Sequence, residues 1–77
     1  MILDLIVTKT NDGYTAEIPS LTGCESWAHK EEEVIEKIFE LAVFYLGLNS
    51  PADLKIDKAR SIKNKSVYKL VFDKNTL

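Results

Sequence analysis

The sequence is poor in the residues with which small proteins reinforce a thin core. Its 77 residues include one cysteine, Cys24, and one histidine, His29. A single thiol excludes an internal disulfide, and one thiol with one imidazole falls short of a structural zinc site. A chain this short buries only about 60% of the surface that its unfolded form exposes. We therefore expect no metal or cofactor, and we expect self-association or a partner protein to supply the missing stability.

Long apolar segments are also missing. The longest one, residues 38–48, contains Glu40 and is much shorter than the roughly 20 residues of a membrane-spanning helix. Asp4 interrupts the apolar start of the chain, and no small-residue cleavage motif follows it, which predicts that there is no signal peptide. Together with the free thiol, these features predict a cytoplasmic protein without membrane contacts, folded as a single domain over residues 1–77.

Charge is unevenly distributed along the chain, although the net charge is only −2. Residues 1–54 carry ten acidic and three basic side chains, whereas residues 55–77 carry seven basic and two acidic ones. Two interpretations stay open: a solvated lysine-rich segment, or a bipolar surface whose acidic side meets a basic partner. The basic residues lie on neither a recognition helix nor an aromatic-rich stretch, so direct nucleic-acid binding is not expected.

The first 28 residues have the pattern of an antiparallel meander. Residues 2–9 alternate in polarity and are rich in branched aliphatic side chains, as expected of a strand. The Asn-Asp-Gly sequence at 11–13 predicts a tight turn, because these residues tolerate the positive φ that hairpins require. Residues 14–18 and 24–28 are predicted to form the second and third strands.

Residues 30–46 are predicted to form the one long helix. Three glutamates, at positions 31–33, crowd its first turn, where carboxylates favour the positive end of the helix dipole. Gly47 suits a left-handed C-terminal cap, and Pro51 prevents continuation. Residues 49–64 are polar and predict a loop.

Residues 65–73 alternate again and predict a fourth strand. The fold class is then α+β with the order β-β-β-α-β, in which the last strand joins the sheet after the helix and runs parallel to a neighbour. One helix covers only one face of such a sheet. The other face would carry four apolar side chains with charges among them: Ile2, Ile6, Val67 and Val71.

The predicted helix has more apolar surface than one sheet needs. Its apolar side chains span roughly 200° of the helix circumference, whereas a surface helix needs a stripe of about 100°. Either the C-terminal loop covers the excess, or an intermolecular contact does. We select Phe39, Val43 and Phe44 as the extra edge, because they border the acidic side that holds Glu36 and Glu40.

Catalytic arrangements find little support in the sequence. Asp4 and Asp73 are the carboxylates that a two-metal nuclease site would use, but the helix glutamates lie on the other side of the sheet from them. Cys24 and His29 have no third orienting group and no glycine-rich loop nearby to bind an oxyanion. We therefore expect no enzymatic activity.

Residues 14–27 resemble the signature of the HicB family of antitoxins. That signature is a strand of the form Y-x-A-x-x-P-x-L-x-G-C, followed by a further strand and a glutamate-rich helix start. His29 and Lys30 stand where the family usually has an Asp-Thr capping pair. The matching positions are Tyr14, Ala16, Pro19, Leu21, Gly23 and Cys24.

The resemblance implies a partial RNase H-like fold without RNase H activity. It also implies a partner, because HicB proteins bind and neutralise HicA, a small basic toxin that cleaves mRNA, and commonly form dimers or larger oligomers. No DNA-binding domain follows in these 77 residues, so we expect no operator binding. The alternative is a self-associating structural or regulatory domain with no toxin partner. The candidate interface residues for partner or oligomer are Trp27, Phe39, Val43, Phe44, Glu36 and Glu40.

Overall fold

The computed structural model describes residues 1–72, apart from the side chain of Ala59. The predicted α+β class is confirmed, and residues 1–72 form five strands and one α-helix. The elements, in chain order, are β1 (Ile2–Lys9), β2 (Tyr14–Glu17), β3 (Glu25–Ala28), α1 (Glu31–Leu46), the short 3₁₀ helix η1 (Pro51–Asp53), β4 (Leu54–Ile62) and β5 (Lys65–Phe72).

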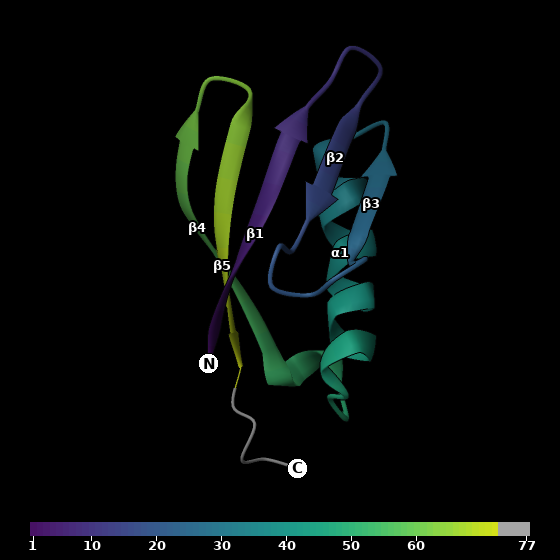
Figure 1. Cartoon of the computed structure of the whole chain (residues 1–77), viewed down its shortest axis with the longest axis vertical. Helices are drawn as coiled ribbons and strands as arrows, with labels where there is room; N and C mark the ends of the chain where they lie inside the picture. Colours follow the sequence, from purple (N-terminus) through teal and green to yellow (C-terminus); the bar gives the residue numbers. More distant parts are fainter. Residues whose placement is uncertain (73–77) are drawn as a thin grey trace.

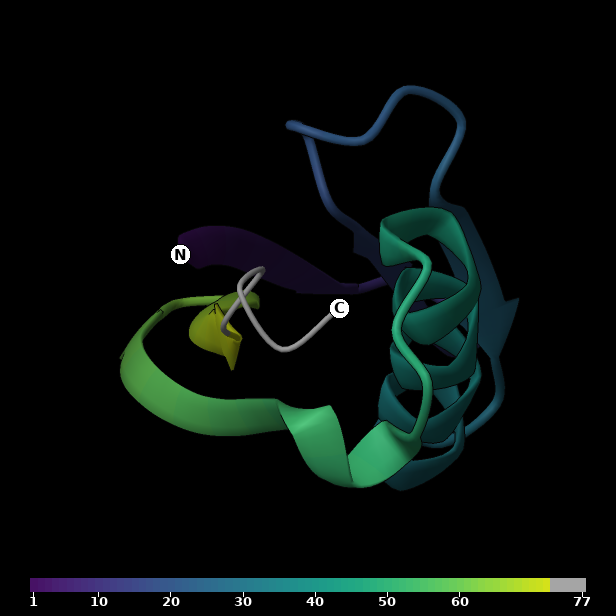
Figure 2. The same cartoon turned by 90° about the horizontal axis from the view of Figure 1, so that it is seen from below.

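The five strands form one sheet in the order β3-β2-β1-β5-β4, and every neighbouring pair is antiparallel. Helix α1 packs against one face of this sheet, mainly over β2 and β3 (Figure 1). Seen from below, the chain leaves the helix through η1 and curves across to β4, the edge strand at the opposite end of the sheet from β3 (Figure 2). The opposite face of the sheet has no covering element in residues 1–72.

The core lies between the helix and the inner face of the sheet. The helix contributes Val34, Ile38 and Ala42, which are four residues apart and so lie on one side of it. Each large apolar side chain removed from water here stabilises the fold by about 1.5–3 kcal/mol. The strands and loops contribute Leu5, Val7, Ala16, Ile18, Cys24, Ala28, Leu48, Leu54, Leu70 and Phe72.

The ends of α1 follow the sequence prediction closely. Gly47 has φ 66° in the left-handed region, and its backbone N–H donates to the carbonyl of Phe44, which confirms the predicted cap. Lys30 stands at the N-cap and makes no side-chain capping bond. The first-turn glutamates at 31–33 therefore provide the favourable electrostatics at this end.

The prediction of a polar loop over residues 49–64 is wrong from Leu54 onward. Strand β4 pairs with β5 from Leu54 opposite Phe72 to Ile62 opposite Lys65, and Leu54 is buried. A β-bulge between Lys58 and Arg60 interrupts the alternation of side chains. This break, together with the charged residues that an edge strand tolerates, gives β4 the composition of a loop.

The prediction that the last strand runs parallel to a neighbour is also wrong. Strand β5 is antiparallel to both β1 and β4. The reason is that β4 intervenes between the helix and β5, and the loop at Lys63 and Asn64 reverses the chain. Lys63 has φ 51°, and the Asn64 carbonyl accepts a bond from the backbone N–H of Lys9 at 2.7 Å.

The turn at residues 11–13 uses its glycine for a reason other than the predicted one. The backbone N–H of Thr10 donates to the Gly13 carbonyl at 2.8 Å, but none of residues 11–13 has a positive φ. A Cβ on Gly13 would lie 2.3 Å from the Ala28 carbonyl oxygen. Gly13 is therefore required because the backbone leading out of β3 passes directly against it.

Candidate protein-binding surfaces

The outer side of α1 carries a strip of carboxylates that ends in an exposed aromatic ring. Its glutamates are all exposed, and Phe44 is 81% exposed, which makes it the most exposed large apolar side chain of the described chain. Residues three and four apart on a helix are surface neighbours, so these side chains form one continuous face. We call this set the acidic helix face: Glu32, Glu33, Glu36, Glu40 and Phe44.

The acidic helix face is not neutralised within the described chain. The ion pair recorded in residues 1–72 joins Lys69 to Asp4, and no helix glutamate takes part in one. Lys37, the basic side chain of the helix, donates instead to the backbone carbonyl of Trp27 at 3.3 Å. Because this bond draws the ammonium group toward β3, the carboxylates stay available to an external cation.

The other two helix residues selected from the sequence lie deeper. Phe39 and Val43 are half-buried and pack against the core cluster. Tyr45 is 44% exposed and contacts Phe44 edge to face, with ring centroids 6.2 Å apart. The structure thus brings Glu36, Glu40 and Phe44 together on the acidic helix face, with Phe39 and Val43 beneath.

Trp27 lies on the opposite side of the sheet from α1. Its neighbours in β3, Ser26 and Ala28, are more buried, whereas the indole of Trp27 is 41% exposed. The ring packs edge to face against His29, with centroids 4.6 Å apart. Trp27 is therefore not part of the same surface as the helix candidates, with which it was predicted to form one interface.

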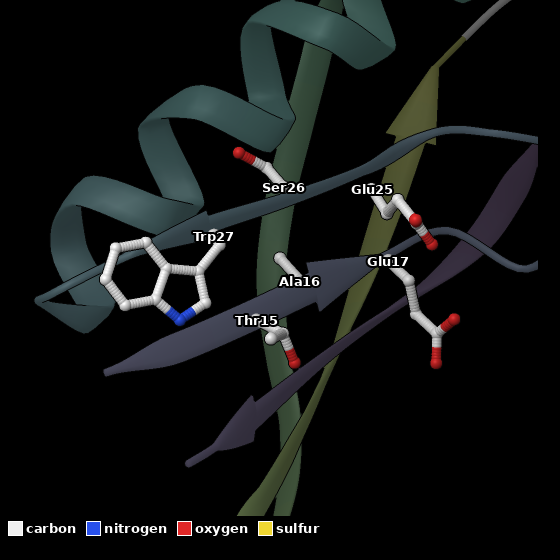
Figure 3. A pocket seen from close by; sticks show the side chains of 6 residues that line it. All are labelled: Thr15, Ala16, Glu17, Glu25, Ser26 and Trp27. Carbon is white, nitrogen blue, oxygen red and sulfur yellow. The ribbon is translucent and has the colours of Figure 1, made fainter. Parts of the chain in front are cut away.

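A shallow hollow of about 500 Å³ adjoins Trp27 on the β2–β3 hairpin. Thr15 lies opposite Trp27 and Glu17 lies opposite Glu25 in the register of these strands. Figure 3 shows the two glutamate side chains side by side on the same face as the indole. Like charges directly opposite each other destabilise a sheet by a few tenths of a kcal/mol to about 1 kcal/mol, and no described cation pairs with them.

The register of the sheet defines the rest of this uncovered surface. Residues directly opposite on neighbouring strands point to the same face, so each row can be followed from β3 to β4. One row holds Glu25, Glu17, Ile6, Val67 and Arg60, and the next holds Trp27, Thr15, Thr8, Lys65 and Ile62. The remaining rows hold Asp4, Lys69 and Asp57, and then Ile2, Val71 and Lys55.

We call this surface the open sheet face. Its β2–β3 half carries Glu17 and Glu25, and its β4–β5 half carries three lysines and Arg60 with one carboxylate, Asp57. Aliphatic side chains lie between the two halves. The sequence pattern predicts the apolar part of this face but does not place Glu17, Glu25 and Arg60 on it. The alternation of side chains within β2 and β3 is a signal that could have placed the two glutamates on this face. Placing Arg60 on it requires that β4 be recognised as a strand.

The described candidate catalytic side chains are buried, hydrogen-bonded or ion-paired. Cys24 is buried, and burial raises the pKa of its thiol, so the reactive thiolate is disfavoured at neutral pH. His29 Nδ1 lies 3.4 Å from the Asp12 carbonyl oxygen. Asp4 is paired with Lys69, while Asp73 lies outside the described residues. Within residues 1–72, no three histidine, cysteine or carboxylate side chains gather as a metal site.

Tyr68 links β5 to the start of α1. Its hydroxyl donates to Oε2 of Glu31 at 3.3 Å, and Lys58 Nζ lies 5.9 Å from its ring centroid. Burial, together with the charge and hydrogen bond of Glu31, raises the pKa of Tyr68. The neutral phenol is therefore the form that fits this junction.

The free energy of unfolding should fall as the pH rises above about 9. The pKa values of Cys24 and Tyr68 are raised in the folded state above their ordinary values of 9.0 and 10.0. The folded protein thus holds protons that the unfolded chain releases, so alkaline pH favours unfolding. Urea denaturation between pH 7 and pH 11 measures this slope. The double variant Cys24→Ala, Tyr68→Phe should flatten it, and an unchanged slope in that variant would contradict the assignment.

No helix among the described residues is long and apolar enough to cross a membrane. No family model matches the chain, and no solved structure matches it significantly. The fold and its surfaces define a two-layer α+β protein, in which the described part of the chain covers its antiparallel sheet with a helix on one face.

One curated relative places this chain in a family. Over 66 residues the chain is 32% identical to the UPF0150 protein of Helicobacter pylori (strain J99 / ATCC 700824). The match covers 86% of this chain and 85% of that relative. The chain belongs to the UPF0150 family.

Proposed function

We propose that this protein is a HicB-like, antitoxin-type protein of the cytoplasm. In this proposal it binds a small basic HicA-type toxin and blocks cleavage of mRNA by protein–protein contact. The HicB-like signature at residues 14–24 and the small α+β architecture support the assignment. The observation that carries it is the acidic helix face, where four exposed glutamates lead to the exposed ring of Phe44.

The acidic helix face has the chemistry that a basic RNA-binding toxin would meet. Carboxylates along one side of a helix attract the lysine and arginine side chains that otherwise contact RNA phosphates, and they speed association. An exposed aromatic side chain at the end of such a strip provides the large apolar contact typical of interface hot spots. Charge would then guide the encounter, and burial of Phe44 would slow dissociation.

The unpaired glutamates also have a cost that a partner would offset. Like charges four residues apart on a helix, such as Glu36 and Glu40, destabilise it by about 0.2–0.5 kcal/mol per pair. Glu32 and Glu36 repeat the arrangement one turn earlier. A cationic partner surface would turn this repulsion into attraction.

We also propose that the fold is the partial RNase H-like one that the resemblance implies. Strands β1, β2 and β3 follow one another as antiparallel neighbours before the helix, which supports this assignment. The β4–β5 hairpin then completes the sheet on the other side of β1.

Co-expression tests the function directly. A HicA-type toxin is induced in a bacterial host with and without this chain, and both growth and the integrity of cellular mRNA are followed. We expect the chain to restore growth and intact mRNA, and we expect a complex of the purified chain with a toxin variant lacking its catalytic histidine. Absence of rescue together with absence of a complex, tested against the product of any adjacent small basic reading frame, would refute the toxin partnership.

The second candidate is a self-associating structural or regulatory domain with no toxin partner. The open sheet face favours it, because an uncovered face with aliphatic side chains at its centre invites contact with another protein. Self-association without any rescue of toxicity would favour this candidate over the first.

A further inference from the structure

We propose that the open sheet face is the docking site for a second copy of this chain, packed face to face about a two-fold axis parallel to β1. The inference concerns a surface separate from the acidic helix face, and it stands whether or not a toxin is bound. The observation that supports this proposal is that the open sheet face is complementary to itself in charge and in exposed apolar side chains.

The charges on this face are arranged to match a second copy. A two-fold axis parallel to β1 reverses the strand order, so β4 of one copy lies over β3 of the other. The axis leaves the position along the strands unchanged. Each row of one copy therefore lies over the same row of the other copy, with the order of its residues reversed. Arg60 of one copy then lies over Glu25 of the other, because both belong to the same row. Because of the two-fold symmetry, this contact occurs twice in the dimer.

The exposed apolar side chains match in the same way. Trp27 and Ile62 stand at opposite ends of the neighbouring row, and they are 41% and 56% exposed. The same axis places Ile62 of one copy over Trp27 of the other. Ile2, 63% exposed, and Ile6 lie on β1, where the axis passes, and meet their own counterparts. Asp4, which lies between them, also meets its counterpart, but each Asp4 is already paired with Lys69 of its own chain.

Other occupants and other orientations would place like charges against one half of this face. An axis across the strands would place Glu17 and Glu25 over the same acidic half of the second copy. A uniformly basic partner would meet Lys55, Arg60 and Lys65 on the β4–β5 half, and a nucleic acid would meet the two glutamates. A second copy in the reversed orientation is the partner that satisfies both halves.

The area of the open sheet face determines how tightly we expect the two copies to bind. The five strands hold 8, 4, 4, 9 and 8 residues. At about 3.3 Å per residue and about 4.8 Å between strands, they present a face of roughly 500 Å². Two copies therefore bury roughly 1,000 Å², which is near the lower limit for a specific interface. We expect a dimer that dissociates in the micromolar range.

A charge exchange tests the proposed contact. Sedimentation equilibrium of the full chain at low salt, from about 1 µM to 1 mM, should show a mass that rises toward twice 8.7 kDa. Glu25→Arg alone and Arg60→Glu alone should each weaken the dimer about tenfold or more. The double variant, which restores opposite charges at both contacts, should recover dimerisation to within about threefold of the original.

The matched control is Glu36→Arg, which makes the same charge change on the acidic helix face and should leave the dimer unaffected. Circular dichroism confirms that each variant is folded. Trp27 is the sole tryptophan, so its emission should shift to the blue as the dimer forms. A wild-type chain that stays monomeric at 1 mM, or a double variant that does not recover, would overturn the proposal. Rescue of toxicity in the co-expression assay is a separate readout, so the two proposals fail independently.

Discussion

Replacing Phe44 with alanine and Glu36 with lysine in one variant should lower the affinity for a HicA-type toxin about 100-fold. Truncation of an aromatic hot spot costs about 2 kcal/mol or more of binding free energy, and reversal of a charge facing a basic partner adds to this. The fold should be unaffected, because Phe44 is 81% exposed and Glu36 is exposed. The lysine also removes repulsion between Glu36 and Glu40.

Isothermal titration with a catalytically inactive toxin measures this loss. The matched control is the variant Ile62→Ala, Glu17→Lys, which removes an exposed aliphatic side chain and reverses one charge on the open sheet face. The control should bind the toxin with nearly the original affinity. If both variants lost affinity equally, or if neither did, the acidic helix face would not be the toxin-binding surface.

Replacing Gly13 with alanine should reduce the free energy of unfolding by about 2–4 kcal/mol. The added Cβ would lie 2.3 Å from the Ala28 carbonyl oxygen, and it would also press on the ring of Trp27 at 3.0 Å. A side chain can rotate away, but the backbone of Ala28 is held in the pairing of β3 with β2. Relief therefore requires the end of β3 to move.

Urea denaturation of Gly13→Ala against wild type measures this effect, and Gly47→Ala serves as the control. Gly47 has φ 66° but no neighbouring atom within 4 Å of an added Cβ, so its loss should come from backbone strain alone, about 1 kcal/mol. Equal losses at the two positions would show that close approach to Ala28 is not what requires Gly13.

The helix was the most predictable element. Its apolar side chains recur with helical spacing, and Gly47 and Pro51 mark its end, so both its position and its left-handed cap were correct. These signals are local, because they depend on residues within one or two turns of each other. The α+β class followed from this helix and the flanking alternating segments.

The β4–β5 hairpin was not predictable in the same way. Its loop, Lys63-Asn64, contains no glycine, although Lys63 adopts the positive φ for which glycine is favoured. The bulge between Lys58 and Arg60 also breaks the alternation that identifies a strand. Missing this strand led directly to the wrong direction for β5.

The two candidate surfaces differ in the same way, because one follows from local spacing and the other from strand pairing. The grouping of Glu36, Glu40 and Phe44 follows from helical spacing alone. The relation of Glu25 to Arg60 passes through four strand pairings, which the sequence does not contain as a local pattern. For the same reason, the position of Trp27 on the face opposite the helix required the register of β2 and β3.

Cleavage of mRNA by a purified HicA-type toxin, measured while this chain is added in increasing amounts, tests the proposed function most directly. Cleavage should fall to background when the chain approaches equimolar amounts, and the variant Phe44→Ala, Glu36→Lys should require far more protein for the same effect. Undiminished cleavage in excess wild-type chain, or equal inhibition by that variant, would contradict neutralisation through the acidic helix face.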